Sequence, residues 1–247
     1  MERIDSPPSL PPESLRKAVD WAIVTRRSIR AFLSTPVPPA EVEGILRVAS
    51  HAASGVNTQP WRVRVLYGAA KDRLSDAIAA VNDDPEESAQ HQEPYDYYPV
   101  EWASPYIDRR RKVGWDLYGL LGIEKGDKRR MHLQHGRNYR FFGAPVGLIF
   151  TMDRLMREGS FIDYGMFLQS IMVAARGRGL DTCPQVAFIK FHRVIKEQLG
   201  IPDSDLVICG MSLGYADPDS IENSLVTERA SVDQFATYHG LDSESPR

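Results

Sequence analysis

The segment Arg26-Arg27-Ser28-Ile29-Arg30 places three guanidinium groups and one hydroxyl within five positions. It follows residues 14–25, whose apolar side chains recur at helical spacing. Guanidinium groups bind phosphate oxygens in pairs and stay charged at every working pH, so the segment is suited to hold a phosphate group. By itself it would equally fit a solvated helix end, where cations complement the helix dipole.

A second segment, Ser54-Gly55-Val56-Asn57-Thr58-Gln59-Pro60-Trp61, follows after one further helical pattern. Gly55 permits close approach of the backbone to a flat ring, and Asn57 offers both a donor and an acceptor. These residues therefore suit the edge of a heterocycle. Taken alone, they would also fit an ordinary polar loop between a helix and a strand.

Helical and strand patterns interleave along the chain, and no strand-GxGxxG-helix unit indicates a Rossmann fold. A proline cluster opens a second helix with Val42, Ile45, Leu46 and Ala49 on one face. Further helices are expected over 70–81, 161–178 and 191–199, and strands over 61–67, 146–151 and 206–213. Residues 82 to about 106 look like a long excursion from the core, and the chain after Tyr215 looks extended.

Composition limits the classes of partner. The 247 residues are 43% hydrophobic and 26% charged, with a formal net charge of −3, which gives no overall basic field for nucleic acid or a membrane surface. No secretory signal or membrane span is indicated, so a cytoplasmic location is expected. The two cysteines lack zinc-like spacing, and His132 and His135 lack a nearby carboxylate to complete a metal site. No metal is expected.

The order and spacing of the two opening segments resemble the N-terminal signature of the nitroreductase superfamily of FMN proteins. The resemblance continues through Asp163–Met166, Gly179–Pro184, Gly210–Tyr215 and Thr227–Arg229. The middle section, including Tyr98–Trp102 and Asn138–Phe142, is similar to the subgroup that reduces nitrobenzoates and dinitroanilines. The resemblance implies an α+β fold with a mixed, mainly antiparallel sheet packed between helices, in an intertwined homodimer. It also implies one domain over residues 1–247, with 82–140 as a lid and 215–247 as an extended C-terminal arm.

The resemblance also implies which residues bind FMN. Arg26, Ser28 and Arg229 match positions that hold the phosphate and ribityl chain, with Arg27 as a neighbour and Arg30 near the N1 and O2 edge of the flavin. Ala53, Ser54 and Asn57, with Gln59 nearby, match a loop that the partner subunit supplies. Pro184, Gln185 and Val186 match the stretch that lies against the flavin. Two departures from the family pattern are Ala53, where proline is frequent, and Gln185-Val186-Ala187, where the family is richer in glycine.

The implied chemistry needs no catalytic side chain, because flavin N5 is the reactive centre and takes hydride from NADPH or NADH in a ping-pong cycle. A small aromatic acceptor, most plausibly a nitroaromatic, would follow the nicotinamide. Candidates to stack on that acceptor are Trp102, Tyr106, Trp115 and Tyr118, although each could instead pack in the protein. The basic run Arg109–Lys112 could attract an anion or could be a solvated face.

Several other functions fit the same residues. A flavin site of this kind could reduce quinones, remove halogen from a ring or reduce an activated alkene. A slow flavin-storage protein is another possibility. A non-enzymatic protein could bind a polyanion through Arg109–Lys112 and 128–140, where aromatic residues accompany the charge. Cys183 lacks an activating neighbour in sequence and is expected to be inert.

Overall fold

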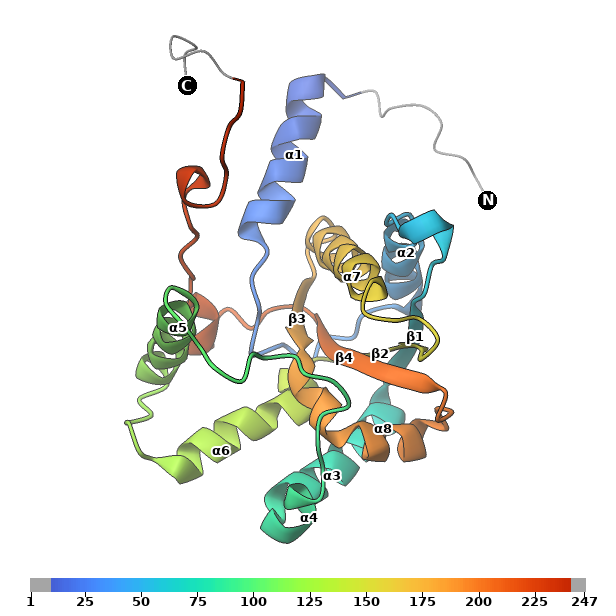
Figure 1. Ribbon diagram of the computed structural model, residues 1–247, viewed down its shortest axis with the longest axis vertical. Helices are drawn as coiled ribbons and strands as arrows, with labels where there is room; N and C mark the ends of the chain where they lie inside the picture. The colour runs from blue at the N-terminus through green and yellow to red at the C-terminus, as the bar shows by residue number, and fades with distance from the viewer. Residues whose placement is uncertain (1–9, 241–247) are drawn as a thin grey trace.

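A computed structural model describes residues 10–240 and shows one four-stranded sheet with helices on both faces (Figure 1). The helices are α1 (Pro12–Thr25), α2 (Pro39–Ala49), α3 (Gly68–Asp83), α4 (Pro85–Ala89), α5 (Tyr106–Leu120), α6 (Lys128–Gly136), α7 (Ser160–Arg176) and α8 (His192–Leu199). The strands are β1 (Arg62–Tyr67), β2 (Val146–Asp153), β3 (Asp181–Gln185) and β4 (Asp205–Gly214). Five short 3-10 helices connect them: η1 (Gly55–Asn57), η2 (Arg137–Gly143), η3 (Val186–Phe191), η4 (Ile221–Ser224) and η5 (Val232–Gln234).

The strands run in the order β1-β2-β4-β3, and each neighbouring pair is antiparallel. Strand β4 is buried along its whole length, because it is central and both faces are covered. A parallel bridge from Ser28 to Thr182 adds the segment after α1 beside β3. The α+β class is confirmed, and the sheet itself is antiparallel.

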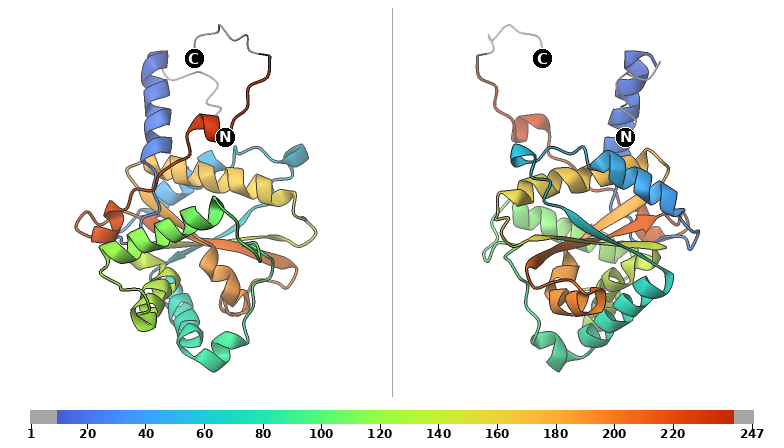
Figure 2. Two further views of the ribbon diagram at one scale, coloured as in Figure 1. Left: turned by 60° about the vertical axis from the view of Figure 1, so that its left-hand side comes forward. Right: turned by 90° about the vertical axis from the view of Figure 1, so that its right-hand side faces the viewer.

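Two apolar layers hold the helices to the sheet. On one face, α2 and α7 pack Ile45, Ala49, Phe167 and Ile171 against β2 and β4. On the other face, α3, α8 and the 3-10 helices pack aromatic and aliphatic side chains, including Leu74, Ile78, Phe141, Phe188 and Ile195. The right-hand view of Figure 2 shows these layers above and below the sheet.

The expected elements agree with the structure where the hydrophobic period is strong. The helices expected over 70–81, 161–178 and 191–199 are α3, α7 and α8, and the expected strands are β1, β2 and β4. Helices α4, α5 and α6 and strand β3 were not predicted from the sequence. Helix α5 has no buried residue, so it carries no apolar stripe, and β3 is a short edge strand that contains a proline.

Helix α1 stands away from the body of the molecule, and so does the C-terminal arm, on the same side (Figure 1). Both carry large apolar side chains in solvent, among them Trp21, Ile23 and Val24 on α1 and Phe235 and Tyr238 on the arm. Within residues 10–240 no helix is long and apolar enough to cross a membrane.

Candidate functional site

The segment that follows α1 lies at the end of the sheet where β3 begins. Ile29 donates its backbone N–H to the carbonyl of Thr182 over 3.1 Å, which fixes Ser28 beside β3. The Oγ1 atom of Thr182 is buried and has no hydrogen-bond partner among the described residues. The hydroxyl is thus a polar group beside Ser28 whose hydrogen bond the described residues do not satisfy.

A cavity of about 740 Å³ opens beside this segment and is called here the arginine cavity. It is lined by Ile23–Arg27, Gln169, Arg176, Val226, Thr227 and Arg229. Burial lowers the pKa of Arg26, and the charge of Arg229 lowers it further. The two guanidinium groups therefore lie close enough to repel each other.

Four arginines of this region have no carboxylate partner among the described residues. Across residues 10–240, no ion pair includes Arg26, Arg27, Arg30 or Arg229. Arg229 donates only to oxygens of its own segment, at Thr227 and Glu228. Like charges held together without a counter-ion favour binding of an anion, and a phosphate dianion would compensate both.

Arg30 lies beyond the arginine cavity and is tied to the C-terminal part of the chain. Its backbone N–H donates to Oδ1 of Asn223 over 2.9 Å, and the side-chain amide of Asn223 donates to the carbonyl of Ala31. The guanidinium of Arg30 reaches the carbonyl of Ser28 at 3.1 Å. Asn223 was not identified from the sequence, since nothing in its local pattern distinguishes it from other polar residues.

A second cavity, also of about 740 Å³, adjoins the first along α7 and is called the tyrosine cavity. Its walls include Tyr95–Tyr98, Glu158, Phe161, Tyr164, Gly165, Leu168, Pro184, Gln185, Val186, Ile208 and Cys209. Leu168 lines this cavity and the next residue, Gln169, lines the arginine cavity. Both cavities therefore border α7, and the tyrosine cavity also borders the end of β3.

The side chain of Gln185 points into the protein. Its Nε2 atom donates to the carbonyl of Asn138 over 2.8 Å, and its Oε1 atom accepts from Ser212 over 2.7 Å. Gln185 is 2% exposed. The stretch Pro184–Val186 can therefore offer its backbone to a ligand, while the glutamine side chain holds β3 in place.

The loop with Ala53, Ser54, Asn57 and Gln59 lies elsewhere. Asp163, near the start of α7, accepts from the backbone N–H of Gly55 over 3.1 Å and so holds the loop at that end of the helix. Arg176, at the other end of α7, lines the arginine cavity. At 1.5 Å per residue the two ends are roughly 20 Å apart, so the loop does not reach the arginines of its own chain.

This loop is exposed and its backbone is strained. Val56, Asn57 and Gln59 have φ values of 44°, 61° and 47°, a region that is rare for residues other than glycine. Hydrogen bonds within the loop support this shape, from Gln59 N–H to Ser54 Oγ and from Gln59 Nε2 to Asn57 Oδ1. Strain retained in an exposed loop is typical of a binding surface.

Arg176 is a residue of this region that the sequence analysis missed. Its guanidinium donates to Thr25 over 3.1 Å, pairs with Asp181 at 3.3 Å and lies 4.8 Å from the ring centre of Trp21. One side chain therefore joins the ends of α1 and α7 to the start of β3. Only the fold brings these partners together, so no local pattern pointed to it.

The four aromatic residues expected to touch substrate occupy three places. The ring centre of Trp102 lies 5.5 Å from that of Tyr98, and the guanidinium of Arg110 lies over the Trp102 ring. Tyr106 is exposed. Trp115 and Tyr118 form an edge-on pair with ring centres 6.3 Å apart. None of them lines the tyrosine cavity. The aromatic residues that do line it include Tyr95, Tyr97 and Tyr98, and their clustering in a polar segment was the available signal.

The buried cysteines are poor nucleophiles. Burial raises the pKa of Cys183 to about 11, despite the nearby charge of Arg30, and raises the pKa of Cys209 to about 12. Both thiols are therefore protonated near neutral pH. No group of three metal-binding side chains occurs in the described part of the chain, and His132 bonds Asp83 at 2.9 Å instead.

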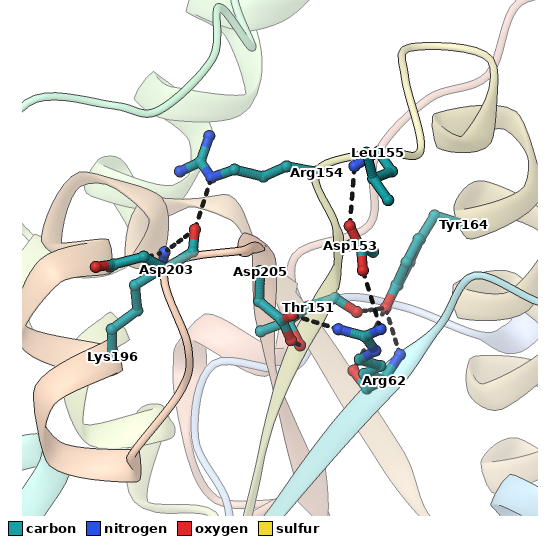
Figure 3. Close-up of polar contacts among 9 residues, drawn as sticks. All are labelled: Arg62, Thr151, Asp153, Arg154, Leu155, Tyr164, Lys196, Asp203 and Asp205. Carbon is teal, nitrogen blue, oxygen red and sulfur yellow. Dashed lines mark hydrogen bonds and ion pairs between the residues drawn. The ribbon is translucent and has the colours of Figure 1, made fainter.

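A separate polar network lies at the other end of the sheet (Figure 3). Arg62 pairs with the fully buried Asp205 and, at 3.3 Å, with Asp153. Thr151 donates to Asp205 over 3.0 Å, and Tyr164 accepts the backbone N–H of Arg62. Every charge here has a partner, so the network joins β1, β2, β4 and α7 and offers no site for a ligand.

Comparisons with known proteins relate the chain to one family. Residues 23–215 match the model of the nitroreductase family. The chain is 43% identical over 223 residues to a 4-nitrobenzoate reductase of Pseudomonas putida, covering 90% of this chain and 96% of that protein. It is 42% identical to a chloronitrobenzene nitroreductase of Comamonas testosteroni, over 89% of this chain and 96% of that protein.

The fold also matches a crystal structure. The FMN and NADPH-dependent nitroreductase NfnB from sphigopyxis sp. strain HMH superposes with a TM-score of 0.86 at 35% identity. The match covers 90% of this chain and 99% of that one. The likeness therefore extends over nearly the whole of both chains.

Proposed function

The chain belongs to the nitroreductase family, and from this we propose that it is an FMN-dependent oxidoreductase that reduces the nitro group of a small aromatic compound with electrons from NADPH or NADH. The observation that carries the proposal is the pair of adjoining cavities. One has three arginines without an ion-pair partner among the described residues, Arg26, Arg27 and Arg229, and the other is lined mainly by aromatic and apolar groups. This arrangement fits a molecule with a phosphate at one end and a flat ring at the other.

The residues divide the task of holding FMN. Arg26, Arg229 and Ser28, with Arg27 beside them, would hold the phosphate and ribityl chain. The backbone of Pro184–Val186 would lie against the ring, and the guanidinium of Arg30 would face its N1 and O2 edge. A cation there stabilises the negative charge of the reduced ring.

FMN, when bound, supplies two-electron hydride transfer from the nicotinamide to the acceptor. The balanced reaction for one turnover is ArNO2 + NAD(P)H + H⁺ → ArNO + NAD(P)⁺ + H2O. The chain contributes binding, orientation and exclusion of water, and no side chain is required as a nucleophile. The segment 82–140, which includes Tyr95–Tyr98 at the tyrosine cavity, would act as the lid.

We further propose a homodimer in which each loop 53–59 completes the site of the partner subunit. The loop lies at the far end of α7 from its own arginines, and its strained, exposed backbone is ready to contact another surface. Exposed apolar residues follow a stripe on α7, at Ile162 and Met166, and continue on α1. Two copies packed through these faces would bring each loop to the other's cavity.

The enzyme would work in the cytoplasm, where the nicotinamide donors are regenerated. The reducing conditions there suit its two buried, free cysteines, Cys183 and Cys209.

The absorption spectrum of the purified protein tests the cofactor. We expect flavin absorbance, or its appearance on reconstitution with FMN, followed by bleaching with NADPH or NADH under nitrogen. Turnover is then compared across nitroaromatics, quinones, halophenols and activated alkenes. A colourless protein that cannot take up FMN would refute the cofactor assignment, and negligible turnover of every nitro compound would refute the acceptor class.

A mixed dimer tests the shared site. Chains carrying Arg26→Ala and chains carrying Asn57→Ala are co-expressed with different tags, and the heterodimer is purified. If the loop acts on the partner's site, one site carries both changes and the other carries none, so half of the wild-type FMN is retained at full affinity. If the loop acts within its own chain, both sites are altered and no full-affinity site remains.

A further inference from the structure

Arg110, in the first turns of α5, lies against two aromatic rings. Its guanidinium carbon is 4.6 Å from the ring centre of Trp102 and 5.5 Å from that of Tyr98. The rings of Tyr98 and Trp102 are 5.5 Å apart, and Tyr97 packs edge-on against Tyr98 at 4.6 Å. This aromatic cluster holds the cation on an otherwise exposed helix.

The N–H groups of Arg110 are free to bind a ligand. Within residues 10–240 its guanidinium makes no hydrogen bond and no ion pair, although carboxylates are common on the surface. The contacts with the two rings do not use its N–H groups as hydrogen-bond donors to an oxygen, so these donors remain available. A guanidinium held in this way is suited to bind a carboxylate through two parallel hydrogen bonds.

Neighbours in the same basic run are different. Lys112 pairs with Asp116 at 2.9 Å and with Glu228 at 3.6 Å, so its charge is already compensated. Arg109 and Arg111 are exposed and have no cation–π contact in the described structure. Of the four basic residues, Arg110 is the one that the fold places against an aromatic surface.

The position of Arg110 relates it to the proposed reaction site. Tyr98, which contacts Arg110, also lines the tyrosine cavity, and Pro184–Val186 form another part of the same lining. An aromatic ring in this cavity could therefore lie against Tyr98 with one substituent at Arg110 and the opposite one toward Pro184–Val186.

Other charges at this cavity restrict where an anion can lie. Asp96 and Glu158 line it and would repel a carboxylate. The guanidinium of Arg110 lies against the ring of Tyr98, one of the lining residues, and is not held by a carboxylate of the described residues. A carboxylate would therefore be accepted at the Arg110 end and rejected near the two acids, which orients the ring as well as binding it.

We propose that Arg110 is a specificity-determining residue that binds the carboxylate of an anionic nitroaromatic acceptor, a nitrobenzoate, and directs its nitro group toward Pro184–Val186. This inference rests on the proposed function and adds to it the charge of the acceptor. The ring carboxylate is ionised at any working pH and the guanidinium remains protonated, so the contact persists across the pH range of the enzyme.

Steady-state kinetics with 4-nitrobenzoate and nitrobenzene test the proposal, because the two differ by the carboxylate alone. In Arg110→Gln the kcat/KM ratio of 4-nitrobenzoate over nitrobenzene falls about 10- to 100-fold, the size expected for loss of a charge-assisted pair, mainly through KM. Arg110→Lys keeps the charge without the two parallel donors and gives an intermediate ratio. Added salt raises the KM for 4-nitrobenzoate in the wild type.

The matched control is Arg111→Gln, which removes the same charge one position away and changes the ratio by less than about twofold because that guanidinium is solvated. Asp96→Asn raises the ratio. Equal effects of Arg110→Gln and Arg111→Gln, or no effect of either, would overturn the proposal.

Failure of this inference is distinguishable from failure of the proposed function. Reduction of nitrobenzene by the wild type reports on the proposed function alone. If no nitro compound is reduced, calorimetric titration of the full chain with 4-nitrobenzoate still tests the role of Arg110. We expect Arg110→Gln to abolish binding of 4-nitrobenzoate and Arg111→Gln to leave it unchanged. Absence of 4-nitrobenzoate binding to the wild type would overturn the assignment of Arg110.

Discussion

Two groups of arginines lie at opposite ends of strand β4 and differ in whether their charges are paired. At the first residue of the strand, buried Asp205 holds Arg62, which also reaches Asp153 (Figure 3). At the far end, where β3 meets β4, Arg26 and Arg229 face each other without a carboxylate among the described residues. Roughly 30 Å of strand separates them.

The two groups of arginines differ in whether they stabilise the folded protein or bind a ligand. A guanidinium with a buried carboxylate contributes to folding, because removing one partner leaves a charge without compensation. Two guanidinium groups without a carboxylate repel each other in the free protein, and this repulsion is compensated when an anion binds. The first group should affect stability and the second should affect ligand affinity.

The largest effect is expected at the paired end. Arg62→Met leaves Asp205 buried without its counter-ion and lowers the free energy of unfolding by about 3 kcal/mol. Urea unfolding of the FMN-free protein measures it. The control Lys17→Met removes an exposed pair with Glu13 and costs less than about 1 kcal/mol. Adding Asp205→Asn to Arg62→Met should restore part of the loss, and a further loss would contradict the pairing.

At the unpaired end, the effect should appear in binding. Arg26→Ala weakens FMN affinity by about 1.5–3 kcal/mol because a charge-assisted hydrogen bond to the phosphate is lost. Fluorescence titration of the FMN-free protein measures it. The same variant should unfold in urea at a midpoint no lower than the wild type, since repulsion with Arg229 is relieved. Unchanged FMN affinity would place the phosphate elsewhere.

A smaller effect on FMN affinity is expected at Asp163, through which α7 holds the loop 53–59. Asp163→Ala removes the acceptor of the Gly55 N–H and weakens FMN affinity by about 1 kcal/mol through the partner's site. The FMN titration is repeated with Glu197→Ala as control, an exposed acid on α8 that makes no ion pair among the described residues. If the two variants bind FMN equally, the loop does not contribute to the site.

The smallest effect concerns pH and belongs to neither group. Burial lowers the pKa of His91, and Arg193 and Lys190 lower it further while Glu87 opposes them. The folded protein therefore binds fewer protons than the unfolded chain just below pH 6.5, and this contribution to stability, present above that pH, decreases as the pH falls. The Tm should fall from pH 7 to pH 5 less steeply in His91→Gln than in the wild type. Parallel slopes would contradict the shift.

The elements that could be predicted from the sequence are those with a strong local pattern of apolar residues. Strands β2 and β4 and helix α7 were identified because each is buried and largely apolar, which gives a long apolar run in the sequence. Helices α5 and α6 were missed within 82–140, since neither buries a residue that would mark its face. Strand β3 was missed because its proline is tolerated only at a sheet edge, and sequence does not reveal which strand is at the edge.

The candidate site divides in the same way. Arg26, Ser28 and Arg229 were identified from motifs, and the fold brings the two arginines to one cavity. Whether the motif residues bind FMN is tested by the titrations above. Arg176, Asn223 and Tyr95–Tyr98 were missed, because each acquires its place through partners far away in the chain.

The sequence by itself determined the periodic elements, the positions of the cations and the order of the family motifs, because each is a property of neighbouring residues. The tertiary structure decided which cations are paired. Arg62 and Asp205 are 143 residues apart, and their contact exists only because β1 and β4 flank β2. Packing likewise placed the loop 53–59 and Arg26 at opposite ends of α7, a separation that no local pattern encodes.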